Sequence, residues 1–166
     1  MINDVSALQA DPGMAALVAE ARVPVVLMHR RATPRPTHQD PVYGDIMAEI
    51  RAFLAERIEA AVSAGISRER ILIDPGFGFG KAVKENLEVL RRLGELRTLR
   101  RPIVIGTSRK ATIGKVLGGL PVEELQEGTA ATVAVAIMHG ADIVRVHDVR
   151  AMVRVARMTD AIVRDA

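Results

Sequence analysis

The stretch Ile71-Leu72-Ile73-Asp74-Pro75-Gly76-Phe77-Gly78-Phe79-Gly80-Lys81 decides the fold. Its first residues form a continuous apolar run, which predicts a buried strand over 71–74. The glycines that follow predict a tight loop, and an amphipathic pattern then predicts a helix from about Lys84 to Leu99. A continuously apolar strand followed by a loop and a helix is the repeating unit of a parallel sheet covered by helices.

Four more units of this kind flank the first. Apolar, β-branched runs predict strands at 2–5, 24–28, 102–105 and 142–146. Helices are expected from Asp11, with Asp11 as the N-cap and Pro12 at the first helical position, and then over 43–63, after Lys110, over 128–139 and over 148–164. The fold class is therefore α/β, in a single domain over 1–166. Either an open doubly wound sheet or part of a (β/α)8 barrel fits this order.

The composition narrows the classes of function. The 166 residues are 49% hydrophobic with a net charge of +3, and cysteine is absent, which excludes disulfides and thiolate chemistry. The densest basic run, 91–101, shares its segment with regularly spaced leucines, which predicts a solvated helix face rather than a nucleic-acid site. No apolar run has the length of a membrane span, so we expect a cytoplasmic protein without a membrane partner.

Every predicted strand ends in polar or charged residues. The five strand ends read Asn3-Asp4, Met28-His29-Arg30-Arg31, Asp74 with its glycine loop, Ser108-Arg109-Lys110, and Arg145-Val146-His147-Asp148. Because the carboxyl ends of parallel strands meet at one edge of a sheet, these residues are expected to form one site. The mixture of cations, a carboxylate and aromatic rings suits a small, flat, anionic ligand.

The loop after Asp74 holds half of the aromatic residues of an aromatic-poor chain, Phe77 and Phe79. Asp74 is expected to accept hydrogen bonds from the ligand at the base of the pocket. The two rings either form a flat pocket wall or plug the end of the barrel, and the sequence leaves both interpretations open. The loop lacks the Gly-Lys-Ser/Thr ending of a Walker A motif.

The residue pattern of the last strand predicts which of its side chains face the barrel axis. Alternate side chains of a strand face opposite ways, so Arg145 and His147 share the face toward the barrel axis with Ile143, whereas Val144 and Val146 face the helices. A guanidinium and an imidazole at one mouth suit phosphate or pyrophosphate. The alternative is an ion pair of Arg145 with Asp148 or with another carboxylate.

Two further strand ends have both a ligand-binding and a structural interpretation. Ser108, Arg109 and Lys110 begin a helix and could attract an anion, or Ser108 could simply cap that helix. His29 follows a strand, where a lone histidine is usually structural. No histidine and carboxylate have metal-ligand spacing, and no catalytic triad is present.

These motifs together resemble the dihydropteroate synthase family, in its order and at its spacing. The resemblance rests on residues 2–5, 27–29, 74–81, 106–110 and 145–149 and covers essentially the whole chain. It implies a TIM barrel and a reaction in folate synthesis, in which p-aminobenzoate displaces pyrophosphate from 6-hydroxymethyl-7,8-dihydropterin pyrophosphate. It also implies a sulfonamide target.

The resemblance implies a role for each matching residue. Asn3, Asp74 and Lys110 would hydrogen-bond the pterin ring, and Met28 and Phe79 would line its pocket. Arg145 would pack against the pterin and, with His147, hold the pyrophosphate, and Ser108 and Arg109 would lie near the p-aminobenzoate carboxylate. The family also uses Mg²⁺, whose ligand is expected on strands that precede this chain, so no metal ligand is assigned here.

A complete (β/α)8 barrel has about 250 residues, and the resemblance begins at the fourth strand of the family. The chain is therefore expected to provide strands 4–8 of an N-terminally incomplete barrel. We expect little activity from it alone, and either self-association into a homo-oligomer or pairing with the missing segment. Two other functions stay open: a methyltetrahydrofolate-type pterin-binding methyltransferase, which has no use for a pyrophosphate clamp, and a non-catalytic fragment that pairs with another chain.

Overall fold

The computed structural model describes residues 1–31 and 44–164 of the chain. Its parallel strands follow one another in chain order. β1 (Ile2–Asp4) pairs with β2 (Val25–Met28), and β2 pairs with β3 (Ile71–Asp74). β4 (Val104–Ile105) pairs with β5 (Ile143–Val144), and a parallel bridge between Ile73 and Ile103 joins the two groups. The five predicted strands are confirmed, although β4 and β5 are shorter than expected.

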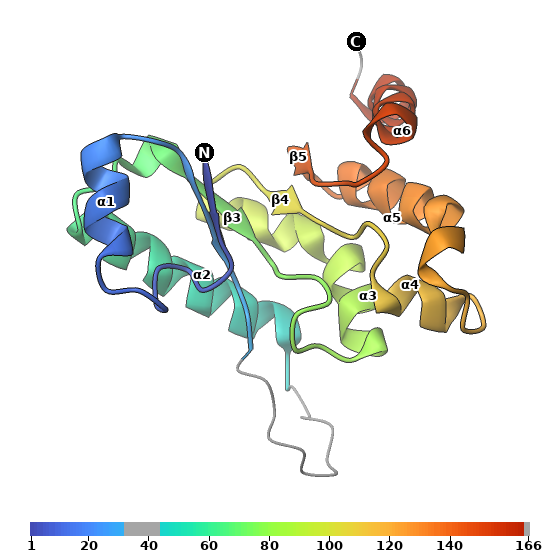
Figure 1. Cartoon of the computed structure of the whole chain (residues 1–166), viewed down its shortest axis with the longest axis horizontal. Helices are drawn as coiled ribbons and strands as arrows, with labels where there is room; N and C mark the ends of the chain where they lie inside the picture. The colour runs from blue at the N-terminus through green and yellow to red at the C-terminus, as the bar shows by residue number, and fades with distance from the viewer. Residues whose placement is uncertain (32–43, 165–166) are drawn as a thin grey trace.

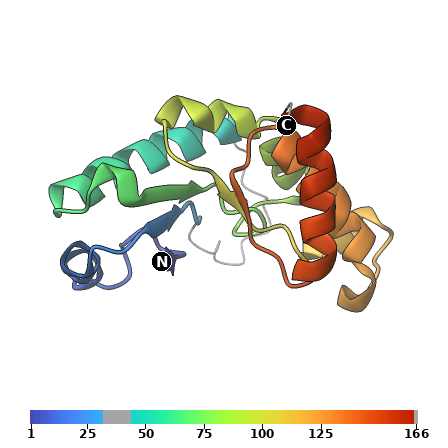
Figure 2. The same cartoon turned by 90° about the horizontal axis from the view of Figure 1, so that it is seen from above.

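The helices follow the strands as the sequence predicts. They are α1 (Met14–Ala21), α2 (Ile46–Ser63), α3 (Val83–Arg91), α4 (Ala111–Val116), α5 (Gln126–Met138) and α6 (Val149–Val163), with short 3-10 helices η1 (Arg68–Arg70), η2 (Leu93–Leu99) and η3 (Val122–Glu124). Figure 1 shows how these elements alternate along the chain. Figure 2 shows the strands inside an arc of helices that runs from α1, in dark blue, over α2 to α6, in red. Among the described residues, no helix is long and apolar enough to cross a membrane.

The two faces of the row of strands differ in what covers them. On the outer face, alternate residues such as Val25, Ile71 and Ile103 pack against the helices in the main apolar core. On the inner face, Val26, Leu72 and Val104 form a small separate cluster. Because side chains alternate between the two faces of a strand, the polar residue that ends a strand lies on the inner face, next to that cluster.

Two predicted helices differ from the structure at their ends. α1 begins at Met14 rather than Asp11, because the Asp11 carboxylate accepts the Gly13 N–H (2.8 Å) and closes a turn first. The expected helix over 84–99 ends at Arg91 and continues as the 3-10 helix η2. A 3-10 helix repeats every three residues, so Leu93 and Leu96 both turn into the core, where both are fully buried.

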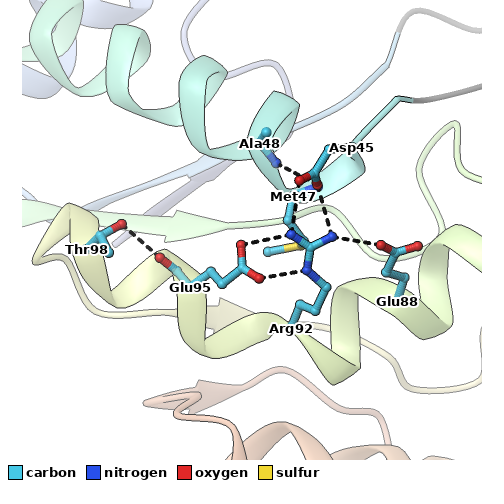
Figure 3. A network of polar contacts seen from close by, with 7 residues as sticks. All are labelled: Asp45, Met47, Ala48, Glu88, Arg92, Glu95 and Thr98. Atoms are coloured by element: carbon cyan, nitrogen blue, oxygen red, sulfur yellow. Dashed lines mark hydrogen bonds and ion pairs between the residues drawn. The ribbon is translucent and has the colours of Figure 1, made fainter.

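The basic run over 91–101 lies on the surface, as predicted, above these buried leucines. Arg92 binds three carboxylates there: those of Asp45 (3.0 Å), Glu88 (2.8 Å) and Glu95 (2.6 Å). Asp45 is also the N-cap of α2 and accepts N–H groups of its first turn. Figure 3 shows this network, which ties the start of α2 to α3 and η2. The predicted start of α2 at Tyr43 lies outside the described residues.

Candidate functional site

A buried carboxylate lies at the end of β3. Asp74 is the last residue of β3, only 4% exposed, and its Oδ1 accepts the Gly76 N–H at 2.7 Å. Burial raises the pKa of Asp74, and the hydrogen bond from Gly76 and the positive charges of Lys110, Lys81 and Arg145 act in the opposite direction. A carboxylate surrounded by cations is the expected acceptor at the base of the pocket.

The two loop rings have different surroundings. The Phe77 side chain is fully buried in the main core, on the helix-covered face of the strands, so its role is structural. The Phe79 side chain is only half-buried, and the Lys110 Nζ lies 4.4 Å from the centre of its ring. The two rings therefore do not share one role, and the pocket-wall interpretation stays open for Phe79 alone. Phe79 is the one available to a ligand.

Lys110 crosses the glycine loop to reach this position. Its Nζ donates a hydrogen bond to the Phe77 carbonyl. A Cβ atom at Gly78 would lie 2.7 Å from the Lys110 Cδ, so only glycine leaves room for the lysine stem. Burial lowers the pKa of Lys110 to about 8, with Arg145 adding to the shift and Asp74 opposing it. The ammonium remains the main form at neutral pH.

The end of β5 carries the two predicted anion ligands. Val144 and Val146 pack against α5 and α6, whereas the Ile143, Arg145 and His147 side chains are exposed. The predicted alternation is thus confirmed. A Cβ atom at Gly106 would lie 3.4 Å from an Arg145 guanidinium nitrogen, so the guanidinium lies across the backbone at the end of β4.

Hydrogen bonds link the ends of β4 and β5. The Ser108 Oγ lies 2.9 Å from the His147 Nδ1 and accepts the His147 backbone N–H at 3.2 Å. Ser108 is not the N-cap of α4, because that helix begins three residues later at Ala111, with Lys110 in the cap position. Asp148 binds Arg109 through two nitrogens, Nη2 (2.7 Å) and Nε (3.1 Å), so Arg109 takes the carboxylate considered for Arg145.

The remaining predicted site residues lie on β1 and β2. Met28 is buried and pairs in register with Asp74, which places it beside the carboxylate. Asn3 is exposed and pairs in register with Val26. His29 is buried and packs edge-on against the Phe53 ring, with the ring centres 5.0 Å apart. Burial, with Lys81 and Arg31, lowers the pKa of His29 to about 3, which agrees with its structural interpretation.

Sequence reasoning missed two polar residues that hold the loop. The Lys81 Nζ lies close to three backbone carbonyls, and Asn86 contacts both Gly78 and the Lys81 carbonyl. The position of Lys81 at the end of the glycine loop is the only signal in the sequence. A cavity of about 290 Å³ lies next to this loop and is lined by residues that include Phe79, Lys81, Lys110 and Lys115.

The described residues do not offer a metal site. No group of three or more histidine, cysteine, aspartate or glutamate side chains in this part of the chain could hold a metal ion. We therefore assign no ligand for the Mg²⁺ that the resemblance implies within the described residues.

Comparison with known proteins assigns the family. Residues 1–147 match the family described as pterin binding enzyme. The chain belongs to this pterin-binding enzyme family. Its curated relatives include the dihydropteroate synthases of Synechocystis sp., 41% identical over 99% of this chain, and of Bacillus subtilis, 44% identical over 97% of it. The matches cover 57% and 54% of those relatives, so the chain spans just over half of their length, and it corresponds to their C-terminal part.

Solved structures of the family share the fold. A Yersinia pestis dihydropteroate synthase in complex with a sulfonamide drug matches with a TM-score of 0.92 and 38% identity, over 99% of this chain and 59% of that one. The Xanthomonas albilineans enzyme in complex with 7,8-dihydropteroate matches with a TM-score of 0.88 and 44% identity, over 98% and 58%. This chain thus folds as part of a TIM barrel, as its sequence predicts.

Proposed function

We propose that this chain forms the C-terminal part of a dihydropteroate synthase active site. The reaction joins 6-hydroxymethyl-7,8-dihydropterin pyrophosphate to p-aminobenzoate and releases pyrophosphate. One observation carries the proposal: a buried carboxylate, Asp74, lies within the electrostatic reach of Lys110 and Arg145, and the Phe79 ring lies against the same lysine. A hydrogen-bond acceptor, two cations and a flat aromatic ring therefore lie close together.

The end of β3 fits the pterin ring. A pterin presents a donor-rich edge, and a carboxylate accepts two such donors at once. In the proposed complex Asp74 binds that edge, Lys110 donates to a ring acceptor, and Phe79 covers one face of the ring. Met28, in register with Asp74, closes the apolar side, and Asn3 adds an amide from β1.

The end of β5 fits the pyrophosphate. Negative charge grows on the leaving group as the bond to the pterin breaks, and nearby cations stabilise that charge. Arg145 supplies a guanidinium on the inner face, and His147 supplies its free ring nitrogen, because Ser108 engages Nδ1. A pterin cation would then react with the amine of p-aminobenzoate, so the protein needs no nucleophile of its own.

The second substrate is a carboxylate that needs a positive partner. Following the resemblance, we assign it to Ser108 and Arg109. Asp148 engages the Nε and Nη2 atoms of Arg109 and leaves Nη1 for a ligand. The same ion pair fixes the guanidinium in place, which lowers the entropy cost of binding.

The open edges of the row of strands support a partner for this chain. Within the described residues, β1 pairs only with β2 and β5 pairs only with β4, and Ile143 on the inner face is 39% exposed. Exposed edges invite pairing with another chain. We propose that the chain self-associates or pairs with a segment that supplies the rest of the barrel, and that it has little synthase activity alone.

Calorimetric titration of the purified chain tests the binding half of this proposal. We expect it to bind dihydropterin pyrophosphate and to bind methyltetrahydrofolate much more weakly, because methyltetrahydrofolate lacks the pyrophosphate that Arg145 and His147 bind in the proposed complex. Preference for methyltetrahydrofolate would instead favour the methyltransferase. Robust dihydropteroate formation by the 166-residue chain alone would contradict the expected need for a partner.

A further inference from the structure

Lys81 is a charged side chain that none of the steps above uses. It is partly buried at the end of the glycine loop, and its Nζ lies 2.9 Å from the Gly76 carbonyl, 3.3 Å from that of Phe79 and 3.5 Å from that of His29. An ammonium has three N–H donors, so these carbonyls occupy all of them. The group is therefore directed at backbone, and a substrate finds no donor left on it.

The loop that Lys81 binds has an unusual need for such a contact. Gly76, Gly78 and Gly80 all adopt positive φ angles, of 71°, 81° and 67°. Glycines are the residues with the greatest conformational freedom in an unconstrained loop. A Cβ atom at Gly76 would lie 1.8 Å from the His29 carbonyl oxygen, so the loop runs directly against the end of β2. Lys81 binds that same carbonyl.

A second polar residue fixes the base from which Lys81 extends. The Asn86 Oδ1 accepts the Gly78 N–H at 2.7 Å, and its Nδ2 donates to the Lys81 carbonyl at 3.1 Å and to the Thr112 Oγ1 at 2.9 Å. Asn86 is 1% exposed. Asn86 thus holds a backbone N–H of the loop, and Lys81 holds its carbonyls.

We propose that Lys81 is a positioning residue for the pterin ring: its ammonium holds the loop over 75–80 against the end of β2 and so fixes the Phe79 ring where the pterin stacks. The inference rests on the proposed function and deepens it. Lys81 acts on the ring through Phe79, and the proposed pyrophosphate ligands Arg145 and His147, which follow β5, lie outside its contacts. Loss of its ammonium should therefore weaken binding of the ring and leave binding of pyrophosphate unchanged.

The absence of cysteine from the chain permits a direct test. A Lys81→Cys variant lacks the ammonium, and alkylation of its single thiol with 2-bromoethylamine restores an ammonium at the length of lysine. We expect the variant to bind dihydropterin pyrophosphate at least about tenfold more weakly, the scale of a lost charged hydrogen bond. Alkylation should restore the affinity to within about threefold, and inorganic pyrophosphate should bind all three proteins alike.

Lys84→Cys is the matched control, because Lys84 is exposed and lies three residues further on. Neither this substitution nor its alkylation should change either affinity. Three results would overturn the proposal: wild-type affinity in Lys81→Cys, a loss that alkylation does not reverse, or an equal loss for inorganic pyrophosphate.

Hydrogen exchange separates this inference from the proposed function. The amides of Gly78, Phe79 and Gly80 should exchange faster in Lys81→Cys and return to the wild-type rate after alkylation. If the wild-type chain does not bind the pterin, the proposed function fails, and the exchange rates alone decide whether Lys81 holds the loop. Unchanged exchange would reject the positioning role.

Discussion

The ends of β3 and β5 divide the candidate site into two unlike halves. At β3 all four strand residues are buried, and the loop that follows is held by Lys81, Asn86 and Lys110. At β5 the inner-face side chains are exposed, and the described chain holds them mainly through the contact of Ser108 with His147. The proposed ring-binding half, at the end of β3, is therefore preorganised within this chain, whereas the proposed pyrophosphate-binding half lies at the end of an edge strand, β5.

Phe77→Ala should break the ring-binding half most severely. The ring is fully buried in the main core, and removing a buried phenylalanine side chain costs about 3–5 kcal/mol of folding free energy. Denaturant unfolding followed by circular dichroism measures this change. Leu17→Ala on α1 is the control, because Leu17 is 55% exposed, and its effect should stay within about 0.5 kcal/mol.

Acid should also destabilise the fold around the ring-binding half, through His29. Its pKa is lowered to about 3 in the folded chain, so below pH 6.5 the unfolded chain binds a proton that the folded chain does not. Stability contributed by neutral His29 is therefore present above pH 6.5 and is lost as the pH falls toward 3. At pH 5 the loss is about 2 kcal/mol.

A His29→Leu variant isolates this contribution. Its free energy of unfolding should fall less steeply between pH 7 and pH 5 than that of the wild-type chain. Identical slopes in the two proteins would mean that other groups carry the acid sensitivity.

Arg145→Ala should break the pyrophosphate-binding half without affecting the fold. We expect affinity for inorganic pyrophosphate to fall about 10- to 100-fold, the scale of charged hydrogen bonds, and the remaining binding to depend less on salt. The melting temperature should change little, because the side chain is exposed. Arg150→Ala on α6 serves as the control and should leave the affinity unchanged.

Arg92→Ala should have the smallest effect. Arg92 binds three carboxylates, as many partners as Lys81 has, but its side chain is 33% exposed and lies outside both halves of the site. Exposed ion pairs contribute little, so we expect a decrease in melting temperature of about 2–4 °C at most and unchanged ligand affinity. A tenfold loss of pterin affinity in Arg92→Ala would show that burial does not distinguish the contacts of Lys81 from those of Arg92 in their effect on the ligand.

The sequence predicted the parts of this arrangement that depend on local pattern. Continuous apolar runs placed all five strands, and the two-residue alternation placed Arg145 and His147 on the inner face. The contacts of Ser108 with His147 and of Arg109 with Asp148 join residues 39 positions apart, so no local pattern encodes them. The different surroundings of Phe77 and Phe79 also escaped prediction, because they depend on packing against residues distant in the chain.

The most direct test of the account is a paired titration of the wild-type chain and an Asp74→Asn variant with dihydropterin pyrophosphate and inorganic pyrophosphate. Asparagine keeps the shape of the side chain but replaces one acceptor oxygen with a donor, so the donor-rich pterin edge loses a partner. We predict a loss of pterin affinity of about 10- to 100-fold with no loss of pyrophosphate affinity, because the substitution removes a negative charge near Arg145. Wild-type affinity for the pterin in Asp74→Asn would contradict the assignment of the β3 end to the ring.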